Sequence, residues 1–204
     1  MEIDAIVLAG GRSSRLGEVP KAGLSFQQRT LLEHAVEAVG FARATVVVGD
    51  VASTVPTGIL TTREEPVFGG PAAGISAGLA RLSQAQTKPS DFTFVLACDM
   101  PSVSAATATL QEALGHGIAS DGLLAVDAFG HPQPLAAVYR TLSLASATAD
   151  HGRNGRLDGL SMFRLIANLS LTEIAVPPGS TDDVDTWDDA ARFGISRPRT
   201  LEES

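Results

Sequence analysis

The chain has 204 residues, of which 44% are hydrophobic and 5% aromatic, so its composition is that of an ordinary globular protein and excludes a disordered one. A formal net charge of −8 and the lack of a basic stripe exclude a general nucleic-acid-binding protein. We expect one domain over residues 1–197 and a frayed tail over residues 198–204. The single cysteine, the lack of a signal-peptide start and the lack of a long apolar run predict a cytoplasmic protein with no membrane partner.

Short apolar segments alternate along the chain with amphipathic segments, which is typical of an α/β fold with a mostly parallel sheet covered by helices. Strands are expected at Ile3–Leu8, Thr45–Val48, Gly58–Thr62, Phe92–Ala97, Gly122–Val126, Leu135–Tyr139 and Thr172–Val176. Helices are expected after a capping box at Thr30, after Pro71 as far as Ser83, over Ser104–Leu114, over Thr141–Ala149 and after Thr186. The polar stretch His151–Asn154 is expected to be a mobile loop, and the pattern over Leu157–Leu165 is ambiguous.

The first strand ends in a glycine-rich loop, IVLAGGRSSRLGEVPK, that runs from Ile6 to Lys21. Gly10 and Gly11 allow a triphosphate to approach the main chain, while Arg15 and Lys21 neutralise its charge. In a P-loop the lysine directly follows the last glycine, whereas here Glu18 follows Gly17 and Lys21 comes later, so a P-loop is excluded. A dinucleotide fingerprint is excluded because G-x-G-x-x-G is absent here. The loop therefore predicts a binding site for a nucleoside triphosphate.

A second motif, FVLACDMP, places Asp99 at the carboxyl end of an apolar strand. Open α/β sheets bind ligands at this edge, and a carboxylate there suits Mg²⁺ held together with substrate phosphates. The competing interpretation, a helix cap, is weaker because Asp99 lies about five residues before the clearest helical residues. Cys98 reads as a small buried apolar residue, since nothing basic adjoins it in the sequence.

A third motif, EEPVFGGPAAGISAGL, spans residues 64–79. Gly70 and Gly74 leave one side of a loop and helix free for a base or a ribose, although tight packing of helix on sheet explains the same glycines. Glu64 or Glu65 offers a carboxylate that accepts from the two neighbouring donors of a guanine base. Of the two, we assign Glu65 to the nucleotide site.

These three motifs, in this order and spacing, resemble the molybdenum cofactor guanylyltransferases, the MobA-like branch of the NTP-transferase superfamily. Two later segments agree: GHPQPLAAVYR resembles the family's acceptor-side strand, and DVDTWDDA resembles its closing motif. The resemblance implies a Rossmann-like nucleotidyltransferase fold of the GT-A-like type. It also implies Mg²⁺-dependent transfer of GMP from GTP to the phosphate of molybdopterin, with release of pyrophosphate. Transient contacts with proteins of cofactor synthesis or with molybdoenzymes are a further implication.

The resemblance also assigns roles to residues. The nucleotide is expected on Leu8, Ala9, Gly10 and Gly11, with its phosphates on Arg15 and Lys21 and its base and ribose near Gly70 and Gly74. Mg²⁺ is expected on Asp99. Asp185 stands where the family commonly has Asn, so it is a second candidate metal ligand, although acidic residues also favour a helix start. Acceptor contacts are expected from His131, Pro134, Arg156 and Asp185.

Three alternatives stay open at this point. A cytidylyltransferase that acts on the same pterin shares the glycine loop and the Asp99 motif. A sugar-phosphate nucleotidyltransferase fits less well, because its usual loop continues to P-L-T before the P-K, which Gly17–Lys21 lacks. A non-catalytic nucleotide-binding paralogue is the third alternative, and the presence of Arg15, Lys21 and Asp99 speaks against it. Arg12 matches no invariant position of the family.

Overall fold

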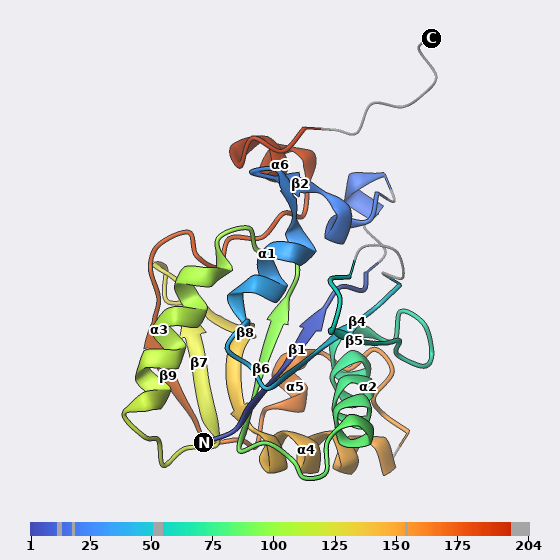
Figure 1. Cartoon of the computed structure of the whole chain (residues 1–204), viewed down its shortest axis with the longest axis vertical. Coiled ribbons are helices and arrows are strands. Elements are labelled where there is room, and N and C mark those ends of the chain that lie inside the picture. Colours follow the sequence, from blue (N-terminus) through green and yellow to red (C-terminus); the bar gives the residue numbers. More distant parts are fainter. Residues whose placement is uncertain (12–13, 18, 51–54, 154, 197–204) are drawn as a thin grey trace.

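The computed structural model describes residues 1–11, 14–17, 19–50, 55–153 and 155–196. Seven strands form one twisted sheet in the order β5-β4-β1-β6-β8-β7-β9 (Figure 1). The strands are β1 (Ile3–Leu8), β4 (Ala44–Val48), β5 (Leu60–Thr62), β6 (Phe92–Ala97), β7 (Gly122–Val126), β8 (Pro132–Arg140) and β9 (Leu171–Ala175). Two further short strands, β2 (Ser25–Phe26) and β3 (Arg29–Thr30), form a separate hairpin.

The sheet is mostly parallel, as the sequence predicts. Strand β1 lies between β4 and β6 and is parallel to both, and β5 continues the parallel half. Strand β8 is the exception, because it runs antiparallel to both β6 and β7. A short turn joins β7 directly to β8, and a connection of that length allows only an antiparallel pair.

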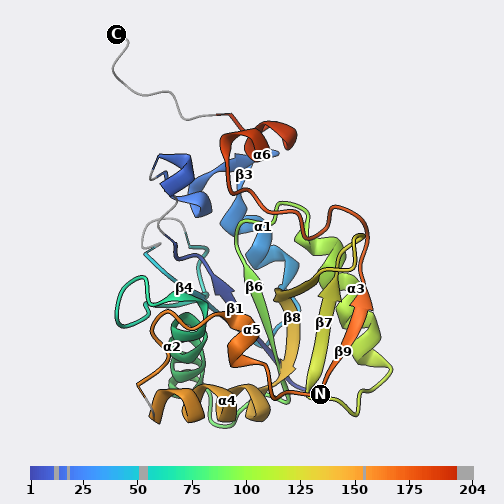
Figure 2. The same ribbon diagram turned by 180° about the vertical axis from the view of Figure 1, so that it is seen from behind.

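Helices cover both faces of the sheet (Figures 1 and 2), so the α/β, Rossmann-like fold class is confirmed. One core cluster lies under α1 (Leu31–Ala38) and α3 (Val103–Gly115). The other lies under α2 (Gly70–Ala85), α4 (Thr141–Arg153) and the short α5 (Met162–Leu165). Among the described residues, no helix combines the length and the apolar character needed to cross a membrane.

After residue 140 the structure corrects one predicted element and resolves one ambiguous stretch. Helix α4 continues through Arg153, so the mobile loop predicted at His151–Asn154 is wrong for residues 151–153. An ion pair between Arg153 and Asp150, one helical turn apart, supports this last turn. The ambiguous stretch contains α5 near its end. Asn154, Arg12 and the tail predicted to be frayed lie outside the described residues.

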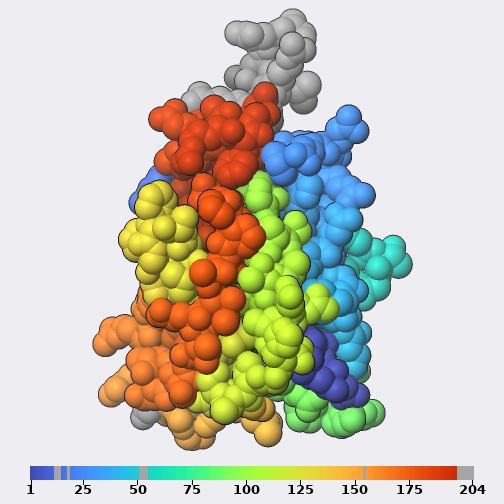
Figure 3. Space-filling model, turned by 90° about the vertical axis from the view of Figure 1, so that its left-hand side faces the viewer, coloured from blue at the N-terminus to red at the C-terminus, as the bar shows by residue number. Residues whose placement is uncertain are grey.

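A third cluster of buried residues joins the two ends of the chain above the carboxyl edge of the sheet. Leu16 and Leu24, from the glycine-rich loop region, pack with Val184, Ala190 and Ile195 from the C-terminal part. Figure 3 shows the C-terminal segment (red) lying against the N-terminal residues (blue) at the top of the molecule. This contact fixes helix α6 (Trp187–Arg192) beside the segment that carries Arg15 and Lys21.

Gly49, directly after β4, packs against the glycine-rich loop, a contact that its sequence context does not reveal. Its φ of +145° lies in the region that favours glycine. A Cβ atom at this position would lie 2.8 Å from both the carbonyl carbon of Ala9 and the amide nitrogen of Gly10. Both atoms belong to the backbone, so the loop itself would have to move.

We therefore expect Gly49→Ala to lower the free energy of unfolding by about 1–3 kcal/mol, the usual cost of overpacking, and to weaken triphosphate binding. The measurements are thermal melting and calorimetric titration with a nucleoside triphosphate. Gly115→Ala is the matched control, because a Cβ at Gly115 meets nothing within 4 Å. Equal affinities in the two variants would show that Gly49 does not set the shape of the loop.

Candidate active site

A cleft of about 850 Å³ opens at the carboxyl ends of β1, β4 and β6. It is lined by residues from all three sequence motifs: the glycine-rich loop, the Asp99 segment and the start of α2. The predicted residues that line it are Leu8, Ala9, Gly10, Gly11, Lys21, Gly70, Gly74 and Asp99. The structure thus brings together three segments that are far apart in the chain.

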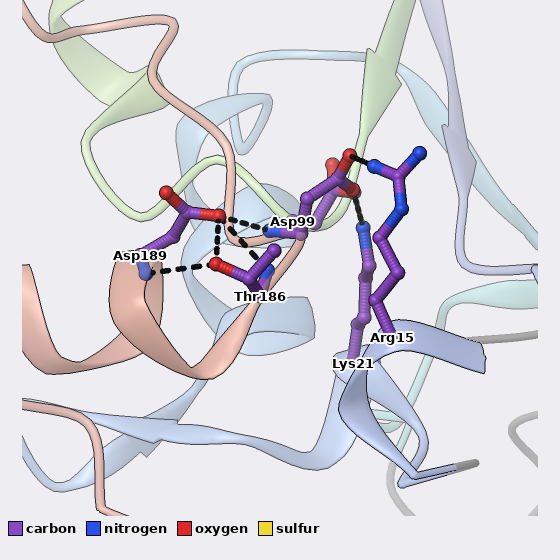
Figure 4. A network of polar contacts seen from close by, with 6 residues as sticks. Arg15, Lys21, Asp99, Thr186 and Asp189 are labelled. Carbon is purple, nitrogen blue, oxygen red and sulfur yellow. Dashed lines mark hydrogen bonds and ion pairs between the residues drawn. The ribbon is translucent and has the colours of Figure 1, made fainter.

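Lys21 and Arg15 meet a pair of carboxylates at one side of this cleft (Figure 4). Lys21 Nζ lies 2.7 Å from Asp99 Oδ2 and also donates to Asp185 Oδ1. Arg15 Nη1 donates to Asp185 Oδ2 at 3.0 Å. The side chains of Lys21 and Asp99 are each 19% exposed whereas that of Arg15 is 72% exposed, so the lysine forms the inner part of the network and the arginine its rim.

The charge state of Lys21 is secured by its neighbours. Partial burial alone would lower the pKa of its ammonium group, but the charge of Asp99 and hydrogen bonds to Asp185 and Asp99 outweigh that effect and raise the pKa above its usual value. Lys21 is therefore a permanent cation at neutral pH. A fixed positive charge at the end of a glycine-rich loop suits a phosphate ligand.

Three carboxylates at this place form a group that can hold a divalent cation. One oxygen each of Asp99, Asp183 and Asp185 lies within 4.8 Å of the others. Partial desolvation, followed by the charges of Asp99 and Asp185, raises the pKa of Asp183, which is expected where like charges crowd. Hard oxygen donors in such a group fit Mg²⁺, which is usually bound by one or two carboxylates together with substrate phosphates.

The fold holds Asp185 in place through its immediate neighbours. The backbone N–H of Val184 donates to the carbonyl of Asp99 at 2.9 Å, and the Val184 side chain is fully buried in the third cluster. Asp189 accepts from the backbone N–H groups of both Asp185 and Thr186, and Thr186 in turn accepts from the N–H of Asp189. This capping box at the start of α6 is visible in Figure 4 and confirms the helix start predicted after Thr186.

The two glutamates of the third motif separate to different places. Glu64 lines the cleft, is 8% exposed and accepts from the backbone N–H of Phe68 at 3.2 Å. Glu65 lines a different depression, beside the outer face of α2. Glu65, which the sequence assigns to the nucleotide site, therefore lies outside this cleft, and its neighbour Glu64 lines the cleft instead.

The glycines of α2 serve packing as well as the cleft. A Cβ atom on Gly74 would lie 3.1 Å from Leu8 Cδ2, and one on Gly78 would lie 3.0 Å from two atoms of Ile6. The packing interpretation of these helix glycines therefore holds. Gly74 also lines the cleft, so the two interpretations do not exclude each other.

The predicted acceptor residues do not gather in one place. His131 is exposed on the β7–β8 turn, where Asp127 holds both its backbone and its ring. Pro134 is buried, and its carbonyl accepts from the hydroxyl of Tyr139, so it offers no free group to a ligand. Arg156 is exposed in the segment after α4. Only Asp185 joins the charged network.

Among the residues that the sequence does not point to are Asp183 and Leu135. Asp183 stands among several acidic residues that favour a helix start, and no local pattern in the sequence separates it from its neighbours. Leu135 lines the cleft from β8. The order of β8 beside β6 brings it there, and the alternation of apolar residues in the sequence reveals only that it belongs to a strand.

The parallel sheet, the glycine-rich loop and the acidic group beside it define an α/β nucleotidyltransferase. The model of the MobA-like NTP transferase domain matches residues 5–164, and the chain belongs to this family. It is 25% identical to a molybdenum cofactor guanylyltransferase of Vibrio campbellii over 193 residues, 93% of each chain.

Solved structures show the same fold. The molybdopterin-guanine dinucleotide biosynthesis protein A of Archaeoglobus fulgidus is similar with a TM-score of 0.67 and 23% identity, over 93% of this chain and 96% of that one. A 2-C-methyl-D-erythritol 4-phosphate cytidylyltransferase of Thermus thermophilus has a TM-score of 0.65 and 20% identity, over 95% and 97%. Proteins whose names refer to guanine and to cytidine nucleotides therefore share this architecture, so the fold alone does not distinguish between the two bases.

The capping box of α6 gives a test of how Asp185 is positioned. We expect Thr186→Ala to lower the free energy of unfolding by about 1 kcal/mol through loss of the cap, and to weaken Mn²⁺ binding because Asp185 loses its support. Thr30→Ala is the matched control, since Thr30 forms the same capping box with Glu33 at the start of α1. Equal Mn²⁺ affinities in the two variants would contradict the positioning role of Thr186.

Proposed function

We propose that this protein transfers GMP from GTP to the terminal phosphate of molybdopterin and releases pyrophosphate. The observation that carries the proposal is the meeting of Lys21 and Arg15 with two members of a group of three carboxylates, at one side of the glycine-lined cleft. Lys21 and Arg15 would neutralise the triphosphate, and the acidic group would bind the divalent ion that accompanies it. The names of the relatives in the same family support the choice of acceptor.

The chemistry asks for alignment and charge neutralisation rather than for a protein nucleophile. The attacking phosphate of the acceptor is already an anion at neutral pH, so no side chain has to activate it. Loop amides near Gly10 and Gly11 orient the triphosphate, and Lys21 and Arg15 neutralise the charge that develops on the pyrophosphate. Asp99, Asp183 and Asp185 would hold Mg²⁺, which supplies further neutralisation of the phosphate oxygens when it is bound.

Glu64 supplies the argument for guanine. Its carboxylate lies in the cleft beside Gly10, with Oε1 3.2 Å from where a Cβ of that glycine would be. Guanine presents two adjacent donors, the N1–H and the exocyclic amine, which a carboxylate accepts together. Cytosine and adenine lack this pair of donors, so the Glu64 carboxylate favours GTP over CTP and ATP.

The direct test is pyrophosphate release from GTP, CTP and ATP in the presence of molybdopterin and Mg²⁺. We expect release with GTP and little with the other two. Release with CTP alone would replace the proposal by the cytidylyltransferase alternative. No release with any of the three would favour the non-catalytic paralogue.

The role of Glu64 is tested by Glu64→Gln, which keeps the oxygen that accepts from Phe68. We expect calorimetric GTP affinity to fall about tenfold, because one charge-assisted hydrogen bond is lost, while CTP affinity stays unchanged. Glu65→Gln is the matched control and should leave GTP affinity as in the wild type. The reverse result, with the loss in Glu65→Gln, would return the base contact to Glu65.

A further inference from the structure

We propose that Lys21 exchanges partners during the binding of substrate. Without a metal ion it is the counter-ion of Asp99 and Asp185, and it leaves them when a divalent cation enters, so that its ammonium group turns to the triphosphate. This proposal rests on the proposed function only for the identity of the triphosphate. It adds that Lys21 couples the binding of the metal to the binding of the nucleotide.

The first argument is that the ammonium group and the metal compete for the same oxygens. Lys21 Nζ lies 2.7 Å from Asp99 Oδ2 and is hydrogen-bonded to Asp185 Oδ1 as well. Asp99 and Asp185 are two of the three members of the acidic group. A divalent cation held by this group would stand next to the ammonium charge, and like charges at such a distance repel strongly in a partly buried site.

Lys21 does not leave Asp99 and Asp185 unless another cation takes its place. With Lys21 and Arg15 in place, two cations face three carboxylates, so the group carries one net negative charge. Departure of Lys21 alone would leave Asp99, which is 19% exposed, beside two other carboxylates, with only the exposed Arg15 on Asp185 as a cation of this group. Partly buried like charges are costly, so Lys21 leaves only when another cation replaces it.

Once it leaves the carboxylates, the Lys21 ammonium group has another partner in the same cleft, the triphosphate. Pro20 and Lys21 line the same cleft as Gly10 and Gly11, whose loop amides suit phosphate oxygens. The flexible four-carbon stem of a lysine allows its ammonium group to turn without a change in the backbone. A triphosphate that captures Lys21 therefore makes metal binding easier, and by thermodynamic reciprocity the metal makes triphosphate binding easier.

The test is Mn²⁺ affinity in the absence of nucleotide, measured by electron paramagnetic resonance. We expect Lys21→Met to bind Mn²⁺ at least about tenfold more tightly than the wild type, because the competing charge-assisted hydrogen bonds are gone. Arg15→Met is the matched control: it removes the same charge, but from a side chain that is 72% exposed and that, among the described residues, pairs with Asp185 only. We expect it to gain less than about twofold, since exposed ion pairs contribute little. Asp99→Asn should lose the site.

Two results would overturn the proposal. An Mn²⁺ affinity of Lys21→Met no higher than that of the wild type would show that the ammonium group does not compete. An equal gain in Arg15→Met would show an effect of overall charge. Because neither measurement contains GTP or a pterin, failure of GMP transfer would be seen separately and would leave this result readable.

A measurement on the wild-type protein removes any dependence on how the variants fold. The chain has two lysines, Lys21 and Lys88, so labelling of the lysine ε-carbon gives two NMR signals. At a saturating Mg²⁺ concentration we expect the Lys21 signal to move and the Lys88 signal to stay, because Lys88 pairs with Glu2, which precedes β1 at the opposite edge of the sheet. A Lys21 signal that stays in place at saturation contradicts the exchange.

Discussion

The candidate site depends on one contact between distant parts of the chain, the attachment of the C-terminal segment to the end of β6. The backbone N–H of Val184 donates to the carbonyl of Asp99, and the buried Val184 side chain packs with Leu16 and Leu24. This contact brings Asp183 and Asp185, which flank Val184 in the chain, close to the carboxylate of Asp99. Without it, Asp99 would be a single carboxylate facing a lysine.

The same contact creates an electrostatic conflict that the chain resolves with cations. Three carboxylates within reach of one ion repel one another, and the raised pKa of Asp183 reflects partial desolvation first and this repulsion second. Lys21 and Arg15 offset part of it in the metal-free protein. A site of this kind is poised to accept a divalent cation, because binding relieves the repulsion. In the proposed function, binding of metal and nucleotide would offset the cost of assembling the cluster.

Local signals in the sequence predict a large part of this structure. Three features depend on residues that are near one another in the chain: both capping boxes, the strands with wholly apolar faces and the glycine-rich loop. Their sequence patterns therefore predict them. The choice between Glu64 and Glu65 depends on the direction of one side chain at the end of a short strand, which periodicity does not resolve. Asp183 and Leu135 join the site through the order of the strands and the folding back of the C-terminal segment. These are long-range contacts, and a single sequence carries no direct signal for them.

We propose that Asp99, Asp183 and Asp185 form the divalent-cation site of a nucleotidyltransferase. We also propose that the Lys21 ammonium group contacts the triphosphate when that site is filled. The most direct measurement is anomalous diffraction at the manganese edge from crystals grown with Mn²⁺ and GTP. The account predicts a manganese peak bonded to Asp99 and to at least one of the other two carboxylates, with the Lys21 ammonium group on the triphosphate. A manganese peak elsewhere, with Lys21 still bridging Asp99 and Asp185, would contradict it.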